Sequence, residues 1–351
     1  MGARAITSSL GDRWRSARTR VAGSAIVLTY HRIVDLPHDT QRLAVCVERF
    51  DEQMRLLSTS YNPMGAGELF DLIARRRRIP DRSVVVTIDD GYSDALLNAK
   101  TILTARSVPA AVFVSSDYIG GGMEFWWDEL ERIVLGAEAL PSCLDIDIGG
   151  ARYCRAVASD PASAGQRDST PGQWDVTMPA SNERQRIYLD LREFVLPLSS
   201  TDRTAALDSL RTQLGADAIV RPSHRPLTTS ELRELGEGGT VEIGAHTASH
   251  QMLSARTRDE QRNEITGCRH ALEQACGREV RLFSYPYGAA DSFSESTARI
   301  VREAGFLGAF TTRFGAAFPW TSRFAVPRCP TENVNGAEFS ERLDRWFEMG
   351  R

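Results

Sequence analysis

The 351-residue sequence lacks several features that would assign it to familiar classes of protein. No segment approaches the roughly 20 consecutive apolar residues of a membrane-spanning helix, so no integral membrane segment is expected. The 42 basic residues are outnumbered by 46 acidic ones, giving a net charge of −4, and this balance provides no general drive toward nucleic acid. The six cysteines form no CxxC pair, which argues against a disulfide framework or zinc knuckle and favours reduced, mostly buried thiols.

The N-terminal region lacks the apolar stretch and the small-residue cleavage site of a secretory signal. Residues 1–20 contain five arginines and are interpreted as a solvated basic arm, with contact to a membrane surface as the alternative. Residues 22–30 are apolar but lead into His31 and Arg32, which is more typical of a strand. We therefore expect a cytoplasmic protein.

The most informative stretch is the run VVVTIDDG at residues 84–91. A continuous apolar run without glycine or proline predicts a strand buried on both faces, and Gly91 permits a sharp turn after it. Asp89 and Asp90 are then expected at the C-terminal end of that strand, where α/β folds place their chemistry. Adjacent carboxylates repel each other, which favours a nearby metal ion. The alternative is a turn in which an aspartate caps the next helix.

Histidines follow two other predicted strands. Residues 25–30 lead into His31, and residues 240–244 lead into HTASH at residues 246–250. His246 and His250 are four residues apart, which would place both on one face of a helical turn, within reach of a single metal ion. Together with one aspartate they would form a site of two histidines and one carboxylate with open coordination positions.

The predicted elements indicate an α/β protein interrupted by an insertion. Up to Ser116 they alternate as β-α-α-β-α-β, which implies parallel strands with right-handed crossovers. The alternation resumes at Thr228, so residues 119–227 are interpreted as an insertion, irregular at 142–180 and helical beyond, that caps or borders the site. Within it, Trp126 and Trp127 either contribute to the buried stripe of a short helix or line a sugar-binding face.

Three motifs resemble those of a known family. In order and in strand-end placement, the chain resembles the polysaccharide deacetylases, the NodB-homology group, at TIDDG (87–91), HTASH (246–250) and FSYPYG (283–288). The resemblance covers roughly residues 24–118 and 228–330. It implies a distorted (β/α) barrel of about seven parallel strands, built from residues 21–118 and 228–351, with the largely helical and irregular insertion at 119–227. The implied reaction is metal-dependent removal of an acetyl group from a sugar.

The resemblance also implies a role for each motif residue. Asp89 matches the general base that deprotonates the attacking water. Asp90, His246 and His250 match the ligands of a divalent metal, with zinc as the first choice. The backbone N–H of Tyr287 matches a donor to the tetrahedral oxyanion, an interaction typically worth about 3 kcal/mol.

The sequence departs from the family pattern at two points. Many relatives carry an arginine in the third motif that pairs with the base, whereas Ser284 stands in that region here, so Arg328 is our candidate for the pairing. Many relatives also take the general acid from a late histidine, and no histidine follows His270. One branch begins instead with a strand ending in Tyr-His, which Tyr30 and His31 match, and His31 is therefore assigned as the acid.

The leading hypothesis is a zinc-dependent N-deacetylase whose partner is an acetylated sugar or glycoside. An O-acetyl esterase or deformylase on the same scaffold is an alternative. A carbohydrate-binding protein that has lost activity is another, although the intact Asp-Asp and His-His set argues against it. An iron oxygenase would leave Asp89 unexplained. His38, His224 and His270 match no motif and are expected at the surface or in loops.

Overall fold

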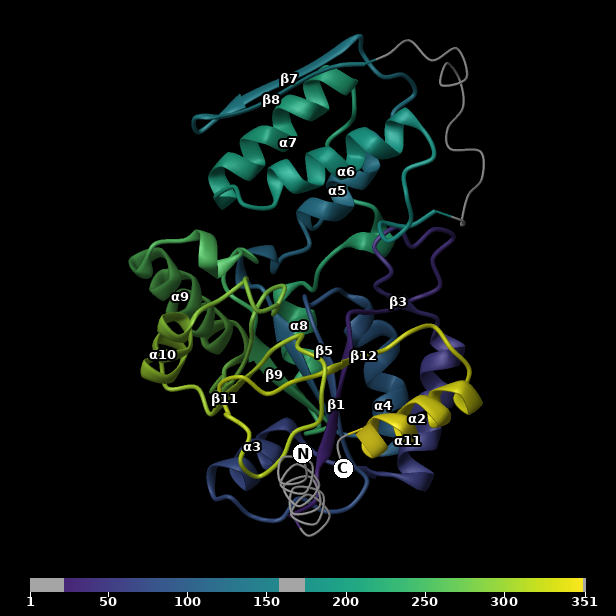
Figure 1. The fold of residues 1–351 in the computed structure, drawn as a ribbon, viewed down its shortest axis with the longest axis vertical. Coiled ribbons are helices and arrows are strands. Elements are labelled where there is room, and N and C mark those ends of the chain that lie inside the picture. The colour runs from purple at the N-terminus through teal and green to yellow at the C-terminus, as the bar shows by residue number, and fades with distance from the viewer. Residues whose placement is uncertain (1–21, 158–173, 350–351) are drawn as a thin grey trace, which may run out of the picture.

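The computed structural model describes residues 22–157 and 174–349 of the chain (Figure 1). The basic arm predicted at residues 1–20 lies outside the described residues. None of the helices in the described ranges is long and apolar enough to cross a membrane.

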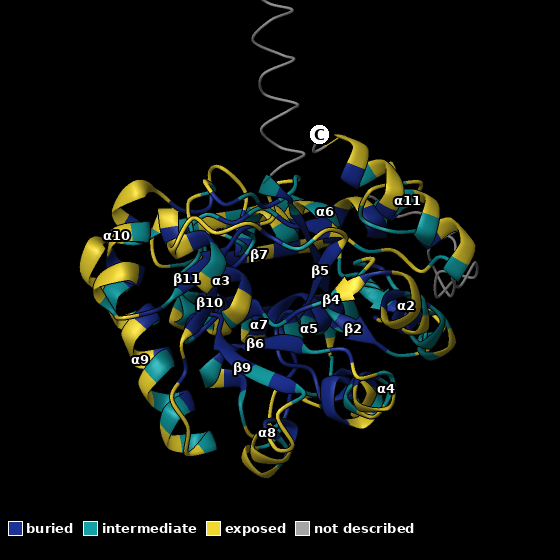
Figure 2. Cartoon of the chain, turned by 90° about the horizontal axis from the view of Figure 1, so that it is seen from below, coloured by how far each residue is buried: buried dark blue, intermediate teal, exposed yellow. Residues whose placement is uncertain are grey.

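Among the described residues, one curled parallel sheet forms the centre of the molecule, and helices surround it (Figures 1 and 2). The short strand β4 (Asn62–Pro63) pairs with the start of β5 beside the main path. Seven strands lie along this path in the order β11 (Gly308–Phe310), β10 (Leu282–Ser284), β9 (Val241–Ala245), β6 (Ala110–Val114), β5 (Ser83–Ile88), β1 (Ala25–Tyr30) and β12 (Cys329–Pro330). The predicted α/β barrel of about seven parallel strands is therefore confirmed.

Helices of the α/β alternation pack around the outside of this sheet. A π-helical turn, Ala95–Lys100, runs directly into one of them, α4. They are α2 (Val47–Ser60), α3 (Ala66–Ala74), α4 (Thr101–Arg106), α8 (Thr229–Leu235), α9 (Arg258–Cys276), α10 (Glu295–Glu303) and α11 (Gly336–Met349). Seen from below, buried strands lie at the centre and the helices expose their outer faces (Figure 2).

Alternation along the strands gives the barrel interior an apolar floor and a polar upper end. In β1 and β5 the side chains of Ala25, Val27 and Val85 pack in one cluster with Phe70 of α3, while the alternate residues face the surrounding helices. Successive side chains of a strand point to opposite faces. The inward positions that continue this series toward the C-terminal end are Thr29, Thr87 and then Asp89, all buried.

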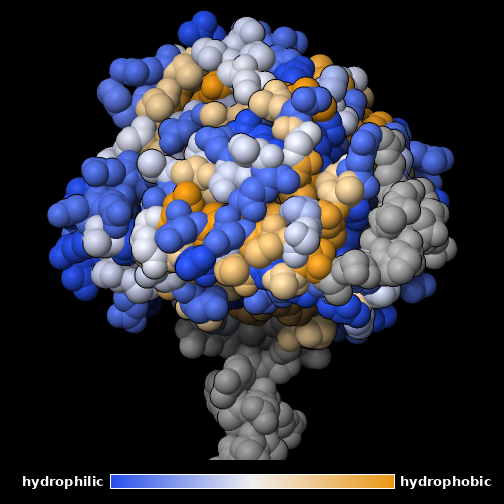
Figure 3. Space-filling model, turned by 90° about the horizontal axis from the view of Figure 1, so that it is seen from above, coloured by the Kyte–Doolittle hydropathy of each residue, from blue (hydrophilic) through white to orange (hydrophobic). Residues whose placement is uncertain are grey.

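The insertion has its own apolar cluster and stands above the barrel in Figure 1. Its helices are α5 (Trp126–Val134), α6 (Glu183–Val195) and α7 (Ser200–Leu214). The stretch 142–180 was predicted to be irregular, and this is wrong for its first part, because β7 (Cys143–Ile148) and β8 (Ala151–Ala156) form an antiparallel hairpin. Alternation of buried Leu144 and Ile146 with exposed neighbours is the signal that the prediction missed. The outer surface of the insertion, seen from above, mixes hydrophilic side chains with apolar ones (Figure 3).

Two smaller expectations also need correction. The last strand was expected at residues 324–328, but β12 begins at Cys329, and Val326 makes only an isolated bridge to Phe310. The cysteines are not mostly buried, since only Cys268 and Cys329 are. His224 was expected at the surface or in a loop, and it lies buried in the 3-10 turn Pro222–His224. The remaining short elements are β2 (Arg32–Ile33), β3 (Ala44–Val45), and the 3-10 turns Ser116–Tyr118, Pro222–His224 and Leu253–Ala255.

Two glycines provide a test of how tightly the barrel is packed. A Cβ atom added to Gly244 in β9 would lie 2.4 Å from the Phe113 ring, whereas one added to exposed Gly267 in α9 would meet no heavy atom within 4 Å. We expect Gly244→Ala to lower the free energy of unfolding by about 1–3 kcal/mol through overpacking. Gly267→Ala should raise it by about 0.5–1 kcal/mol, because alanine restricts the unfolded chain and favours the helix. Urea denaturation of both variants measures the difference, and equal effects would contradict the packing described.

Candidate functional site

The two aspartates lie where β5 ends and the chain turns. Asp90 has φ 73° and Gly91 has φ 90°, both in the left-handed region. A Cβ atom on Gly91 would lie 2.9 Å from a methyl carbon of Val114, so a larger residue would meet both strain and a clash. Aspartate tolerates this conformation better than most residues. The turn separates the directions of the two carboxylates, and Asp89 and Asp90 consequently make different contacts.

Asp90 lies beside His246 and His250, as the sequence predicted. Its Oδ1 atom is 3.6 Å from Nε2 of His246 and 3.3 Å from Nε2 of His250. One ligand atom from each of the three buried residues lies within 4.8 Å of the others. The histidines do not share a helical turn, which corrects the prediction. They lie in a loop after β9, where Thr247 (φ 63°) and His250 (φ 53°) have left-handed backbone conformations.

The donor set of these three residues fits a divalent cation. Nδ1 of His246 lies 2.8 Å from the Ser284 carbonyl oxygen, which can only accept, so Nδ1 carries the proton and Nε2 presents a lone pair toward Asp90. Burial, partly offset by the charge of Asp89, lowers the pKa of His246 to about 4. The imidazole is therefore neutral near pH 7. A carboxylate oxygen facing neutral imidazole nitrogens is the ligand chemistry of zinc and similar metals.

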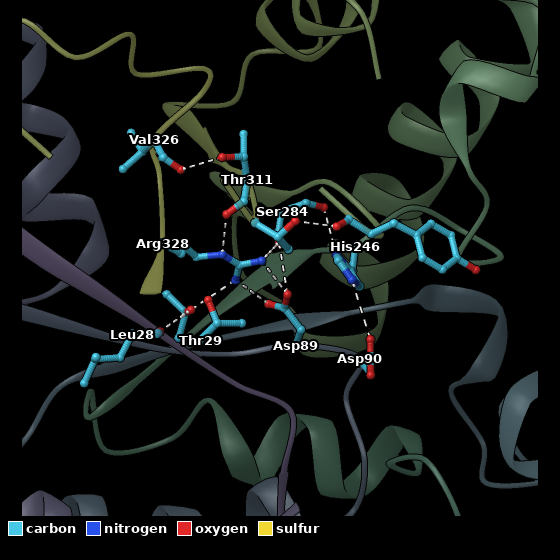
Figure 4. Close-up of polar contacts among 12 residues, drawn as sticks. Leu28, Thr29, Asp89, Asp90, His246, Ser284, Thr311, Val326 and Arg328 are labelled. Atoms are coloured by element: carbon cyan, nitrogen blue, oxygen red, sulfur yellow. Dashed lines mark hydrogen bonds and ion pairs between the residues drawn. The ribbon is translucent and has the colours of Figure 1, made fainter. Parts of the chain in front are cut away.

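Asp89 forms a bidentate ion pair with Arg328, the residue proposed for this role from the sequence (Figure 4). The two bonds run from Nη1 to Oδ1 at 2.8 Å and from Nη2 to Oδ2 at 2.6 Å. The Arg328 side chain is fully buried. Its remaining bonds go to the Thr311 carbonyl oxygen (2.9 Å), Thr87 Oγ1 (3.1 Å) and Ser284 Oγ (3.0 Å).

Ser284, which replaces the expected arginine of the third motif, takes part in the same network. Its hydroxyl donates to Oδ2 of Asp89 at 3.3 Å and accepts from Arg328. Burial raises the pKa of the Asp89 carboxyl, but the charge and hydrogen bonds of Arg328, together with His246 and His31, outweigh it, and the pKa lies well below its ordinary value. Asp89 is therefore ionised throughout the physiological pH range.

A cavity of about 150 Å³ opens beside these groups. It is lined by His31, Gln41, Leu43, Asp89, Asp90, Trp126, Trp127, Arg192, His246, His250, Tyr287 and Thr312. All nine residues singled out from the sequence thus contribute to one region, eight by lining the cavity and Arg328 from behind Asp89. Gln41, Leu43, Arg192 and Thr312 were not foreseen, since they lie in loops or on an amphipathic helix without a local motif.

The backbone around Tyr287 is held in one orientation. Tyr287 has φ 62°, and Gly288 is required after it because a Cβ atom there would lie 2.5 Å from the Thr312 nitrogen. The Thr312 hydroxyl donates to the Tyr287 carbonyl oxygen at 2.6 Å, and the Thr312 N–H donates to the Gly288 carbonyl oxygen at 3.0 Å. These bonds fix the two peptide planes after Tyr287. The plane that holds the Tyr287 N–H, assigned to an oxyanion from the resemblance, is fixed by the Gly288 N–H, which donates to the Pro286 carbonyl oxygen at 2.7 Å.

The two tryptophans are mostly buried, and both still border the cavity. The Trp126 Nε1–H donates to the Tyr287 hydroxyl at 3.3 Å. The Trp127 ring lies 4.8 Å from that of His250 in an edge contact, and its Nε1–H donates to the Tyr92 hydroxyl at 2.8 Å. Tyr92 in turn donates to Asp128 at 2.6 Å. Trp127 therefore supports a metal-ligand candidate, and Trp126 is the better placed of the two to contact a ligand.

The parallel barrel carries its Asp-His-His cluster at the strand ends. A family model described as polysaccharide deacetylase matches residues 212–309, which include the second and third motifs. YxkH of Bacillus subtilis (strain 168), which is named for the polysaccharide deacetylases, is 26% identical over 119 residues. The match covers 34% of this chain and 41% of that relative.

Solved structures show the same fold at low sequence identity. The deacetylase PplD of Streptococcus pyogenes, in complex with acetate, has a TM-score of 0.56 at 13% identity, and the match covers 92% of this chain and 99% of the PplD chain. IcaB from Ammonifex degensii has a TM-score of 0.54 at 17% identity, covering 93% and 97%. With the three motifs and the family model, these findings make the chain similar to the polysaccharide deacetylases, the NodB-homology group, in part of its sequence and in its fold.

The Asp89–Arg328 pair is expected to dominate the stability of the site. Arg328→Met would leave a buried carboxylate without its counter-charge, and we expect the free energy of unfolding to fall by about 3–5 kcal/mol. The double variant Asp89→Asn/Arg328→Met should lose less than the sum of the two single variants, because no unpaired charge remains.

Urea denaturation of the four proteins in this cycle measures the coupling. The control is Arg342→Met, which removes a more exposed pair with Glu338 on α11 and should cost no more than about 1 kcal/mol. Additive losses in the cycle, or equal losses for Arg328→Met and Arg342→Met, would contradict the assignment.

Proposed function

We propose that this chain is a metal-dependent hydrolase that removes an acetyl group from an N-acetylated sugar. The observation that carries the proposal is the side-by-side placement of an arginine-paired Asp89 and the Asp90–His246–His250 cluster in one small cavity. Relatives with this fold support it, since they include a deacetylase in complex with acetate and a de-N-acetylase of Aggregatibacter actinomycetemcomitans.

Asp90, His246 and His250 would hold a divalent ion, with zinc as the first choice. Such an ion, when bound, supplies a Lewis acid that acidifies water and polarises the acetyl carbonyl. Asp89 would accept the proton of the attacking water. Because Arg328 keeps its pKa low, Asp89 is a weak base, and it suits a water that is already acidified.

The other cavity residues would complete the reaction. The Tyr287 N–H would donate to the developing oxyanion, in the role typical of a positioned backbone donor. His31 follows β1 and is only partly buried, and it would donate a proton to the leaving nitrogen. An amine leaves an amide carbon only with such a proton, so a histidine in the cavity favours an N-acetyl over an O-acetyl substrate. The Trp126 indole would cover an apolar face of the sugar.

The alternatives remain an O-acetyl esterase or a deformylase on the same scaffold. An inactive sugar-binding protein is a third. It explains the cavity but gives no reason for a buried carboxylate, Asp89, beside a cluster of metal-ligand type. Burying that charge carries a desolvation cost even with Arg328 as its partner, and a binding protein has no use for it.

Metal binding is the first property to test. Titration of metal-free protein with Zn²⁺ by calorimetry should show one equivalent bound, and we expect His246→Ala and His250→Ala to weaken the affinity more than tenfold, because each removes one of three ligands. His270→Ala, at an exposed position of α9, is the control and should bind as the wild type does. Unchanged affinity in both site variants would exclude this metal site.

Acetate release from N-acetylhexosamine substrates, free, nucleotide-linked and oligomeric, tests the reaction itself. For the zinc-loaded protein we expect release that falls by about 10²–10⁴-fold in Asp89→Asn, the range typical of losing a general base. Asp71→Asn, an exposed position on α3, is the matched control and should retain activity. Undiminished release by Asp89→Asn would refute the assigned base. No release from any substrate by zinc-loaded wild type would favour a different acyl group or the binding protein.

A further inference from the structure

A second, larger cavity adjoins the small one. It has a volume of about 320 Å³ and is lined by residues of the insertion, by the segment that follows β6, and by Ser249 of the loop after β9. Trp126 lines both cavities. If the acetyl group of a sugar lies in the small cavity, the rest of the ligand can therefore extend past the Trp126 indole into the larger cavity.

Arg203 of α7 lines the larger cavity with a charge that has no counter-charge. Its side chain is 3% exposed, and none of the ion pairs among the described residues includes it. The Nε and Nη1 atoms are buried without a hydrogen bond of good geometry, and Nη2 makes long contacts of 3.5 Å with the carbonyl oxygens of Leu196 and Leu198. The neutral Tyr118 phenol also interacts with the guanidinium. The guanidinium stands 5.3 Å from the centre of the Trp126 ring. Buried polar groups are nearly always satisfied, which points to a ligand.

Arg192 of α6 presents a second such charge to the small cavity. Its Nε is buried without a hydrogen-bond partner, and the ion pairs found among the described residues do not include it. Burial raises the pKa of the Tyr287 phenol, and the charges of Arg203 and Arg192 both act to lower it. Both guanidinium groups therefore lie near one side chain of the site.

The acids around the larger cavity do not neutralise these arginines. Glu124 and Glu129 line it, but each already pairs with Arg132, and Arg211 pairs with Glu129 as well. Asp117 also lines it but is exposed, so water and salt screen its charge. Tyr118, next to Arg203, brings no charge at neutral pH because burial raises the pKa of its phenol.

We propose that Arg192 and Arg203 form an anion subsite, and that the substrate is an N-acetylated sugar carrying a phosphate ester. This inference rests on the proposed deacetylase function for the acetyl end of the ligand. Guanidinium groups bind phosphate oxygens through charge-assisted, often bidentate, hydrogen bonds. The unused donors of the two arginines supply these bonds. The phosphate can come from a sugar phosphate, a sugar nucleotide or a lipid-linked sugar, which share this chemistry.

Equilibrium binding to the metal-free protein tests the subsite without turnover. The probes are N-acetylglucosamine 1-phosphate and neutral N-acetylglucosamine, measured by calorimetry at low and at moderate salt. We expect the wild type to bind the phosphorylated sugar at least tenfold more tightly, with a preference that falls as salt rises. Arg192→Gln and Arg203→Met should each reduce this preference severalfold. Arg186→Gln, at an exposed arginine of the same helix as Arg192, is the matched control and should keep it.

Equal binding of the two sugars by the wild type, or binding of neither, overturns the subsite. So does a preference that survives in both variants. Thermal unfolding verifies that each variant is folded, and if Arg203→Met fails to fold, the half-buried Arg192 decides the result alone. The deacetylase proposal is judged separately by acetate release. If the protein prefers the phosphorylated sugar but releases no acetate, the subsite is supported and the deacetylase reaction is refuted. If it releases acetate from neutral sugars and shows no preference for the phosphorylated sugar, the reaction is supported and the subsite is refuted.

The source of the phosphate is then identified by two further probes, a uridine diphosphate sugar and a short-chain isoprenyl phosphosugar. Tighter binding of the first than of the sugar 1-phosphate assigns a nucleotide. Tighter binding of the second assigns a lipid-linked substrate. If neither exceeds the sugar 1-phosphate, the free phosphorylated sugar is the ligand, and all three results retain the anion subsite.

Discussion

The buried ion pair between Asp89 and Arg328 is the interaction on which the rest of the site depends. Taking two charges out of water costs several kcal/mol for each ion, and this cost is offset only where the remaining donors and acceptors are satisfied. Here the guanidinium also reaches the Thr87 and Ser284 hydroxyls and the Thr311 carbonyl oxygen. The partners come from β5, from the end of β10 and from the segment after β11. The pair therefore links the end of β5 to the later strands of the barrel, and it fixes both the ionisation and the direction of the carboxylate.

The position of that pair follows from the two-residue period of the strands. Interior positions of β1 and β5 run from alanine and valine at the floor to threonine and then Asp89 at the upper end. The apolar floor supplies the burial that stabilises the barrel, and the upper end supplies the polar groups. Phe113 and Phe70 fill the floor, which is why Gly244 and Gly308, respectively, have no room for a side chain. Along each strand of this sheet, the apolar residues that stabilise the barrel lie at the lower end, and the polar residues of the site lie at the C-terminal end.

The sequence predicted the parts of this arrangement that have local signals. The run before Asp89, the spacing of His246 and His250, and the third motif each mark a strand end, and the structure brings them together. Arg328 was foreseen only because Ser284 left the carboxylate without a partner. Contacts that arise from distant packing had no such signal. Arg192 lies on an ordinary amphipathic helix, and Gln41 and Thr312 lie in loops, so nothing in the local pattern separates them from surface residues. The backbone of the HTASH loop also escaped prediction, because two left-handed residues replaced the expected helical turn.

The residues that line the two cavities come from two parts of the chain, the barrel and the insertion. Residues of the barrel provide Asp89, the Asp90–His246–His250 cluster and Tyr287, whereas the insertion provides Trp126, Trp127 and the arginines that line the cavities, Arg192, Arg203 and Arg211. The insertion has its own apolar cluster, yet that cluster includes Tyr92 from the segment directly after the Asp89–Asp90 turn. Through Tyr92 and Trp127 the insertion contacts the His250 ring. A change in the insertion that alters which sugar is accepted can thus leave Asp89 and Arg328 untouched, while a change at Trp127 reaches the metal-ligand cluster itself.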